Sequence, residues 1–108
     1  MKFVVAIVHK NDADAVLKAA LKASFRATRL SSKGGFLSSD NTTLLMGVED
    51  ERTDELIALI KKYSSRRKEI LPPLPTQVFE GGLSSSPIEV SVGGATVFII
   101  EAEEFFRV

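Results

Sequence analysis

The sequence predicts a single α+β domain, spanning residues 1–108, in which two helices cover one face of an antiparallel sheet. The chain has 108 residues, of which 44% are apolar and 26% are charged, a balance that suits one globular core. Two apolar stretches, residues 3–8 and 42–48, are each followed by acidic residues and an amphipathic segment. This repeat of a strand and a helix predicts a ferredoxin-like sandwich of βαββαβ order.

The first strand and helix occupy residues 3–22. Residues 3–8 (FVVAIV) form a continuous apolar and largely β-branched run, which is typical of a central strand. We expect Asn11 or Asp12 to cap the helix that follows. Its apolar stripe is Val16, Leu17, Ala20 and Leu21. Residues 25–32 alternate between apolar and polar side chains, which predicts a strand with one partly solvated face.

The second strand and helix occupy residues 42–68. Residues 42–48 form a second buried strand, and Asp50 is expected to cap the helix. The apolar stripe of that helix is Leu56, Ile57, Ile60 and Tyr63. The helix ends in three basic residues, Arg66, Arg67 and Lys68.

The remaining chain predicts additions to the sandwich. Residues 71–87 contain all four prolines, a Gly-Gly pair and three serines, so we expect a long loop, and such loops are usually functional. Residues 88–92 and 95–100 flank Gly93-Gly94, which predicts a hairpin and therefore an extra strand. In the tail, residues 101–108, we expect a short turn with Phe105 and Phe106 packed inward.

Composition excludes several functions. Lys plus Arg and Asp plus Glu number fourteen each, and a net charge of zero argues against a protein that binds a nucleic-acid polymer. The absence of cysteine excludes disulfides, thiol catalysis and thiolate metal sites. The opening apolar run is too short for a membrane helix or a signal-peptide core, so we expect a cytoplasmic protein that does not bind membranes.

Residues 34–50 (GGFLSSDNTTLLMGVED) indicate a nucleotide-binding segment. Gly34 and Gly35 free the backbone to point N–H groups at phosphate oxygens. Phe36 offers a face for stacking on a base, or it anchors the loop to the core. Asn41 has the donor and acceptor that read adenine, or it caps the turn before the strand.

The preceding strand adds a second candidate group. Arg26 and Thr28 lie two residues apart, so they share the strand face that points away from the predicted helices. A guanidinium there could bind a phosphate, with the threonine hydroxyl beside it. The alternative is that both side chains only cover a solvated strand face.

No catalytic residues, metal site or cofactor are expected. His9 has no second histidine and no cysteine near it, which favours a surface residue. Ser84 to Ser86 lack a neighbouring base. The acidic residues at 12, 14 and 49–51 fit helix N-termini, where negative charge is favoured. The sequence therefore predicts a protein that binds a nucleotide without transforming it.

Motifs along nearly the whole chain resemble those of the cyclic di-AMP receptor family of PII-like signalling proteins. They are FRATRL at 25–30, GGFL and NTT around Phe36 and Asn41, GVEDER at 47–52, and PIEVSVGGATVFII at 87–100. The resemblance implies a PII-like ferredoxin sandwich assembled as a homotrimer. One cyclic di-AMP would bind in each cleft between neighbouring subunits. The loop at the glycine pair would correspond to a short T-loop, and the Pro-rich segment to an enlarged B-loop.

The resemblance also implies which residues bind the ligand. Arg26 and Thr28 would approach it from the strand, Phe36 and Leu37 would pack on an adenine, and Asn41 would hydrogen-bond that base. The glycines would admit the ligand or bring backbone close to it, and the matched positions are Gly35, Gly47, Gly93 and Gly94.

The sequence departs from the family at residues 38–40. The family tends to carry an arginine and a glycine there, whereas this chain has Ser38, Ser39 and Asp40. An added carboxylate beside a dianionic ligand is unfavourable, which leaves a PII-like sensor of ATP, ADP or another nucleotide as the alternative. A ferredoxin-fold RNA-binding module or enzyme has less support. The receptor would also need a downstream protein partner, which the sequence does not identify.

Overall fold

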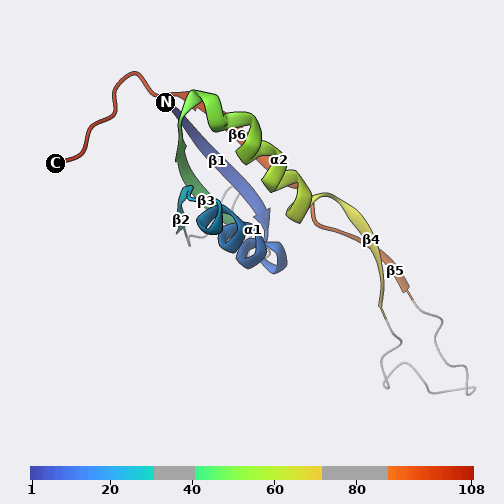
Figure 1. The fold of residues 1–108 in the computed structure, drawn as a ribbon. Helices are drawn as coiled ribbons and strands as arrows, with labels where there is room; N and C mark the ends of the chain where they lie inside the picture. Colours follow the sequence, from blue (N-terminus) through green and yellow to red (C-terminus); the bar gives the residue numbers. More distant parts are fainter. Residues whose placement is uncertain (31–40, 72–87) are drawn as a thin grey trace, which may run out of the picture.

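The computed structural model describes residues 1–30, 41–71 and 88–108 (Figure 1). In chain order the elements are β1 (Lys2–His9), α1 (Lys10–Lys22), β2 (Arg26–Leu30), β3 (Asn41–Val48), the 3₁₀ helix η1 (Asp50–Arg52), α2 (Thr53–Ser64), β4 (Arg67–Leu71), β5 (Ile88–Val92) and β6 (Ala95–Glu101).

Four of these strands form one antiparallel sheet in the order β2-β3-β1-β6, with β1 in its interior. Both helices lie against one face of this sheet and pack on each other (Figure 1). The predicted α+β class, with two helices on one face of an antiparallel sheet, is therefore confirmed. The strand order is consistent with a ferredoxin-like sandwich.

The core lies between the sheet and the two helices. Alternate residues of β1 and β3 point toward the helices and are fully or almost fully buried, because successive side chains of a strand alternate between its faces. They are Val4, Ala6 and Val8 on β1 and Leu44, Met46 and Val48 on β3. They meet Val16 and Ala20 of α1 and Leu56 and Ile60 of α2, which belong to the two predicted stripes.

The helix starts differ from the prediction. The N-cap of α1 is His9, whose Nδ1 accepts a hydrogen bond from the backbone N–H of Asn11 at 3.2 Å. The helix therefore begins before the predicted caps. Asp50 likewise does not cap α2, since it lies in η1 and accepts a hydrogen bond from the N-terminal ammonium group at 2.9 Å.

The predicted hairpin between residues 88–92 and 95–100 is wrong. β5 pairs with β4 in a separate two-stranded ribbon, whereas β6 pairs with β1 in the four-stranded sheet (Figure 1). Gly93 and Gly94, at φ of +80° and +94°, carry the chain from one sheet to the other. The Gly-Gly pair thus marks a change of sheet, because a left-handed backbone suits either a tight turn or a sharp redirection.

Arg67 joins this ribbon to the rest of the protein. It belongs to β4 and not, as predicted, to the end of the preceding helix. Its Nη2 lies 2.8 Å from Oδ1 of Asp12, and its Nη1 lies 3.3 Å from Oδ2 of the same carboxylate. Asp12 is only 5% exposed, so this two-pronged pair neutralises a buried charge. The pair ties the start of the ribbon to the first turn of α1.

The tail also differs from the prediction. Phe105 and Phe106 are 58% and 73% exposed, and residues 102–108 run away from the sheet (Figure 1). The predicted Pro-rich loop falls mostly on residues 72–87, which lie outside the described residues. Within the described part of the chain, neither helix is long and apolar enough to span a membrane.

Candidate functional site

The sheet face opposite the helices carries most of the predicted binding residues that the structure describes. Its side chains form successive cross-strand rows, because paired residues in neighbouring strands point to the same side. The first row is Ile100, Phe3, Gly47 and Arg26. The second is Phe98, Val5, Leu45 and Thr28, and the third is Thr96, Ile7, Thr43 and Leu30. The fourth contains His9 and Asn41.

A cavity of about 710 Å³ lies at the first two rows, and we call it the Arg26 cavity. Arg26, Thr28 and Gly47 all line it, together with Phe3 and Leu45. A Cβ atom built on Gly47 would meet nothing within 4 Å, so open space lies above that backbone. As predicted, Arg26 and Thr28 are exposed, while the intervening Ala27 packs against the core.

The Arg26 cavity also contains Arg52, which the sequence analysis did not single out. Its guanidinium stacks 4.0 Å from the centre of the Phe25 ring, and Nη2 donates to the carbonyl of Ala23 at 2.8 Å. Nη2 and Nε also donate to the Glu55 carboxylate, at 2.7 and 3.1 Å. These hydrogen bonds hold the pKa of Glu55 below its usual range and raise the pKa of Arg52.

Arg26 and Arg52, which line this cavity together with Arg107, differ in what they can offer a ligand. Arg52 is held by a carboxylate, a carbonyl and a ring, so it fixes the turn that precedes β2. Within the described residues Arg26 forms no ion pair, although it is exposed beside the cavity. Unlike that of Arg52, the Arg26 guanidinium therefore remains available for an anionic ligand.

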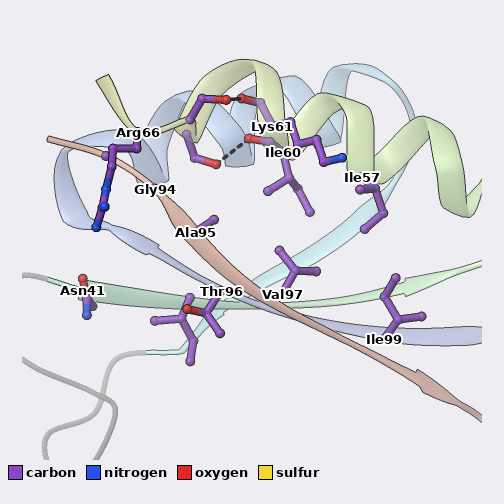
Figure 2. A pocket seen from close by; sticks show the side chains of 14 residues that line it. Asn41, Ile57, Ile60, Lys61, Arg66, Gly94, Ala95, Thr96, Val97 and Ile99 are labelled. Carbon is purple, nitrogen blue, oxygen red and sulfur yellow. Dashed lines mark hydrogen bonds between the residues drawn. The ribbon is translucent and has the colours of Figure 1, made fainter. Parts of the chain in front are cut away.

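A second cavity, of about 910 Å³, lies between the last turns of α2 and the edge strand β6, and we call it the Asn41 cavity. Ile57 and Ile60 of α2 line its helix side, and Asn41 lies at the end of the sheet beside it. Asn41, Gly93 and Gly94 line it, with Arg66 at its edge (Figure 2). The backbone N–H of Gly94 donates to the carbonyl of Ser64, which holds the glycine pair against the end of α2. This cavity combines an amide side chain, a glycine backbone and a nearby cation.

The structure therefore brings the predicted residues together in two groups along β3. Arg26, Thr28 and Gly47 share one cavity, while Asn41, Gly93 and Gly94 share the other. The remaining predicted residues, Gly35, Phe36 and Leu37, lie outside the described residues. Arg52 and Arg66 also line the cavities, although neither was predicted to. The sequence analysis interprets Arg66 as a helix-terminal charge and assigns no role to Arg52.

The aspartates predicted at the helix starts form ion pairs, and that of Asp12 with Arg67 is described above. Asp14 pairs with Arg29, which lowers the pKa of Asp14, and Asp50 pairs with the N-terminal ammonium, which lowers the pKa of Asp50. Across residues 1–30, 41–71 and 88–108, no three carboxylate or histidine side chains gather closely enough to hold a metal ion.

Comparison with known proteins identifies the family. The sequence model of the family described as "Cyclic-di-AMP receptor" matches residues 1–108, the whole chain. The chain belongs to the cyclic-di-AMP receptor family. The family resemblance inferred from FRATRL, GGFL, NTT and the later motifs is thereby confirmed, and the protein is assigned to a family of receptors for a nucleotide second messenger.

A solved structure supports the fold of this family member. The chain is 40% identical to a functionally unknown protein from Pediococcus pentosaceus ATCC 25745, whose crystal structure it matches with a TM-score of 0.79. The match covers 99% of this chain and 96% of that protein. The whole length of this receptor-family chain therefore shares its fold with a protein of closely similar size.

Proposed function

We propose that this protein is a cytoplasmic, non-enzymatic receptor that binds cyclic di-AMP in the clefts between the subunits of a PII-like homotrimer. The observation that carries the proposal is that Arg26, Thr28 and Asn41 lie on the same face of the sheet, in two groups along β3. Arg26 and Thr28 suit a phosphate, and Asn41 suits an adenine edge. All three point away from the helices, so a single extended ligand could contact them together.

The spacing of these groups suits a ligand with more than one recognition element. Thr28 pairs with Leu45, which lies four residues beyond Asn41 on β3. At about 3.4 Å per residue, the two positions are roughly 14 Å apart along the strand. A cyclic dinucleotide has two bases and two phosphates, so it offers a polar group to each end of this span.

The other wall of the cleft would come from a neighbouring subunit. The β1–β6 half of the same face is apolar and incompletely covered, with Phe3, Phe98 and Ile100 between 39% and 50% exposed. Large exposed apolar patches usually mark interfaces. A second copy packed on this half would cover the apolar side chains and stand next to the Arg26 and Asn41 cavities.

Signalling would follow from the position of Gly93 and Gly94. They line the Asn41 cavity and also connect the β4–β5 ribbon to β6. A ligand that contacts their backbone would favour one ribbon arrangement over others and shift the population toward it. A downstream protein would then recognise that arrangement of the ribbon.

Isothermal titration calorimetry with cyclic di-AMP tests the function. We expect saturable binding, and we expect Arg26→Ala to weaken it by about 10-fold or more, since a hydrogen bond to a charged group is lost. Asn41→Ala should also weaken binding while leaving the melting temperature of the free protein nearly unchanged. Arg29→Ala is the matched control, because Arg29 pairs with Asp14 and points to the helix side.

Linear nucleotides in the same series decide the identity of the ligand. Asp40 motivates the comparison of cyclic di-AMP with linear nucleotides, since an acidic residue at this position departs from the family pattern. If ATP or ADP binds and cyclic di-AMP does not displace it, the ligand of the receptor is that linear nucleotide and not cyclic di-AMP. No heat with any of these nucleotides, from a protein shown to be folded, would refute the nucleotide-receptor function as a whole.

A further inference from the structure

Thr43 carries a buried hydroxyl group that has no partner. The residue is 4% exposed, and its Oγ1 atom forms no hydrogen bond among the residues that the structure describes. Buried polar side chains are nearly always hydrogen-bonded, so an exception calls for an explanation. One explanation is that the partner arrives with a ligand.

The position of Thr43 supports that explanation. It lies on β3 between Asn41 and Leu45, on the same sheet face as both, because it is two residues from each. Asn41 belongs to the Asn41 cavity and Leu45 to the Arg26 cavity. Thr43 lines neither cavity, but it lies on β3 between the two groups of predicted binding residues, and its cross-strand neighbour Ile7 lines the Asn41 cavity.

The neighbours of Thr43 indicate which part of a nucleotide it would contact. Its cross-strand partners are Ile7 and Leu30, both apolar. Arg26 is two rows further along the face. A flat base suits such apolar surroundings better than a phosphate does, because a charged group there would lose its hydration without a cation beside it.

We propose that the Thr43 hydroxyl forms a hydrogen bond with the adenine that Asn41 binds. The inference rests on the proposed function and adds a second polar contact to the same base. A hydroxyl both donates and accepts, so it complements either an amino group or a ring nitrogen of the base. The unsatisfied hydroxyl destabilises the free protein, and ligand binding removes that penalty.

Thr43→Val tests the proposal, because valine has nearly the same shape and lacks the hydroxyl. We expect the melting temperature of the free protein to stay the same or rise, since an unsatisfied polar group is removed from the interior. The dissociation constant for cyclic di-AMP, measured by calorimetry, should increase by about 3- to 10-fold, the usual worth of one neutral hydrogen bond.

Two variants control the measurement. Thr42→Val changes the adjacent residue, which points to the opposite face of β3, and should bind cyclic di-AMP as the wild type does. Thr43→Ser keeps the hydroxyl and should retain an affinity closer to the wild type than Thr43→Val does.

Each outcome decides the proposal. A Thr43→Val protein that binds cyclic di-AMP like the wild type contradicts it, whatever its melting temperature. A clear fall in the melting temperature of the free variant also contradicts it, because the hydroxyl would then bond within the protein. Absence of binding by the wild type would refute the proposed function itself, and the wild-type titration shows this separately.

Discussion

Ser24 holds a left-handed backbone conformation, with φ of 67°, directly after α1. The N–H of Phe25 bonds to the carbonyl of Ala20, and the N–H of Ser24 bonds to the carbonyl of Leu21. These two bonds form a Schellman motif, in which glycine is the favoured residue at the left-handed position. A side chain there has a steric cost that glycine avoids.

Ser24→Gly should therefore stabilise the free protein. We expect a gain of about 0.5 to 1 kcal/mol, because the steric relief exceeds the extra backbone entropy of glycine in the unfolded chain. Urea unfolding without ligand measures it. Ser24→Val provides the opposite test and should destabilise, since a branched side chain suits this conformation least. Equal stability of the two variants would contradict this account of the turn.

Local pattern misled the sequence analysis at single residues. Asp12 follows a strand and precedes a helical stripe, which predicts a cap, but His9 is the cap and Asp12 pairs with Arg67. The role of Asp12 is set by its pairing with Arg67, which lies 55 positions further along the chain. A buried ion pair between distant segments leaves no local signature, so sequence reasoning assigned both charges to helix ends.

At the scale of elements, Gly93 is the residue on which the ribbon junction depends. A Cβ atom there would lie 2.6 Å from both Nη1 of Arg67 and the carbonyl oxygen of Ser65, and 3.3 Å from the Asp12 carboxylate. The clash falls on the backbone carbonyl of Ser65, which has no freedom to swing away, and on the Arg67–Asp12 ion pair that anchors β4. Gly94 differs, since its nearest contact would be Cβ of Arg66 at 3.8 Å.

Gly93→Ala should consequently destabilise the protein more than Gly94→Ala does. Both substitutions strain a left-handed backbone, which costs roughly 1–2 kcal/mol. Gly93→Ala also disturbs the pairing of Asp12 with Arg67, so we expect a total loss of about 2 to 4 kcal/mol. Urea unfolding of both variants measures the difference, and amide hydrogen exchange should show it first in β4 and β5. Equal losses would mean that the ion pair does not depend on Gly93.

Periodicity predicted the elements of the sandwich but not the pairing of its last strands. Residues 3–8 and 42–48 and most of both helix stripes fell where expected, because alternation and helical spacing are local properties. The last residue of each predicted stripe did not, since Leu21 is 53% and Tyr63 is 38% exposed. The Gly-Gly pair fits a hairpin equally well on local grounds. Its true role depends on β4, which pairs with β5 across the Pro-rich stretch. No pattern within residues 88–100 carries that information.

At the scale of the whole molecule, the two faces of the sheet differ in what covers them. The helices bury one face, where Val4, Ala6 and Val8 are inaccessible to water. On the other face β2 and the adjoining part of β3 carry the candidate binding groups, while β1 and β6 present apolar side chains. The candidate site therefore adjoins an uncovered apolar surface, so that assembly and ligand binding would involve neighbouring parts of one face.

This arrangement predicts that substitutions on the apolar half control the oligomeric state. Sedimentation or light scattering should give the wild type three times the 11.8 kDa mass of the chain. Phe98→Glu should give monomers, because Phe98 is 44% exposed on the face proposed as the interface and a buried unpaired carboxylate is unfavourable there. Leu21→Glu should leave the trimer intact, since Leu21 is similarly exposed, at 53%, but lies on α1.

The Phe98→Glu monomer should also bind cyclic di-AMP much more weakly, because each cleft would lose one of its walls. A monomeric wild type that binds the nucleotide tightly would contradict the inter-subunit site and leave the Arg26 and Asn41 cavities of one chain as the whole pocket.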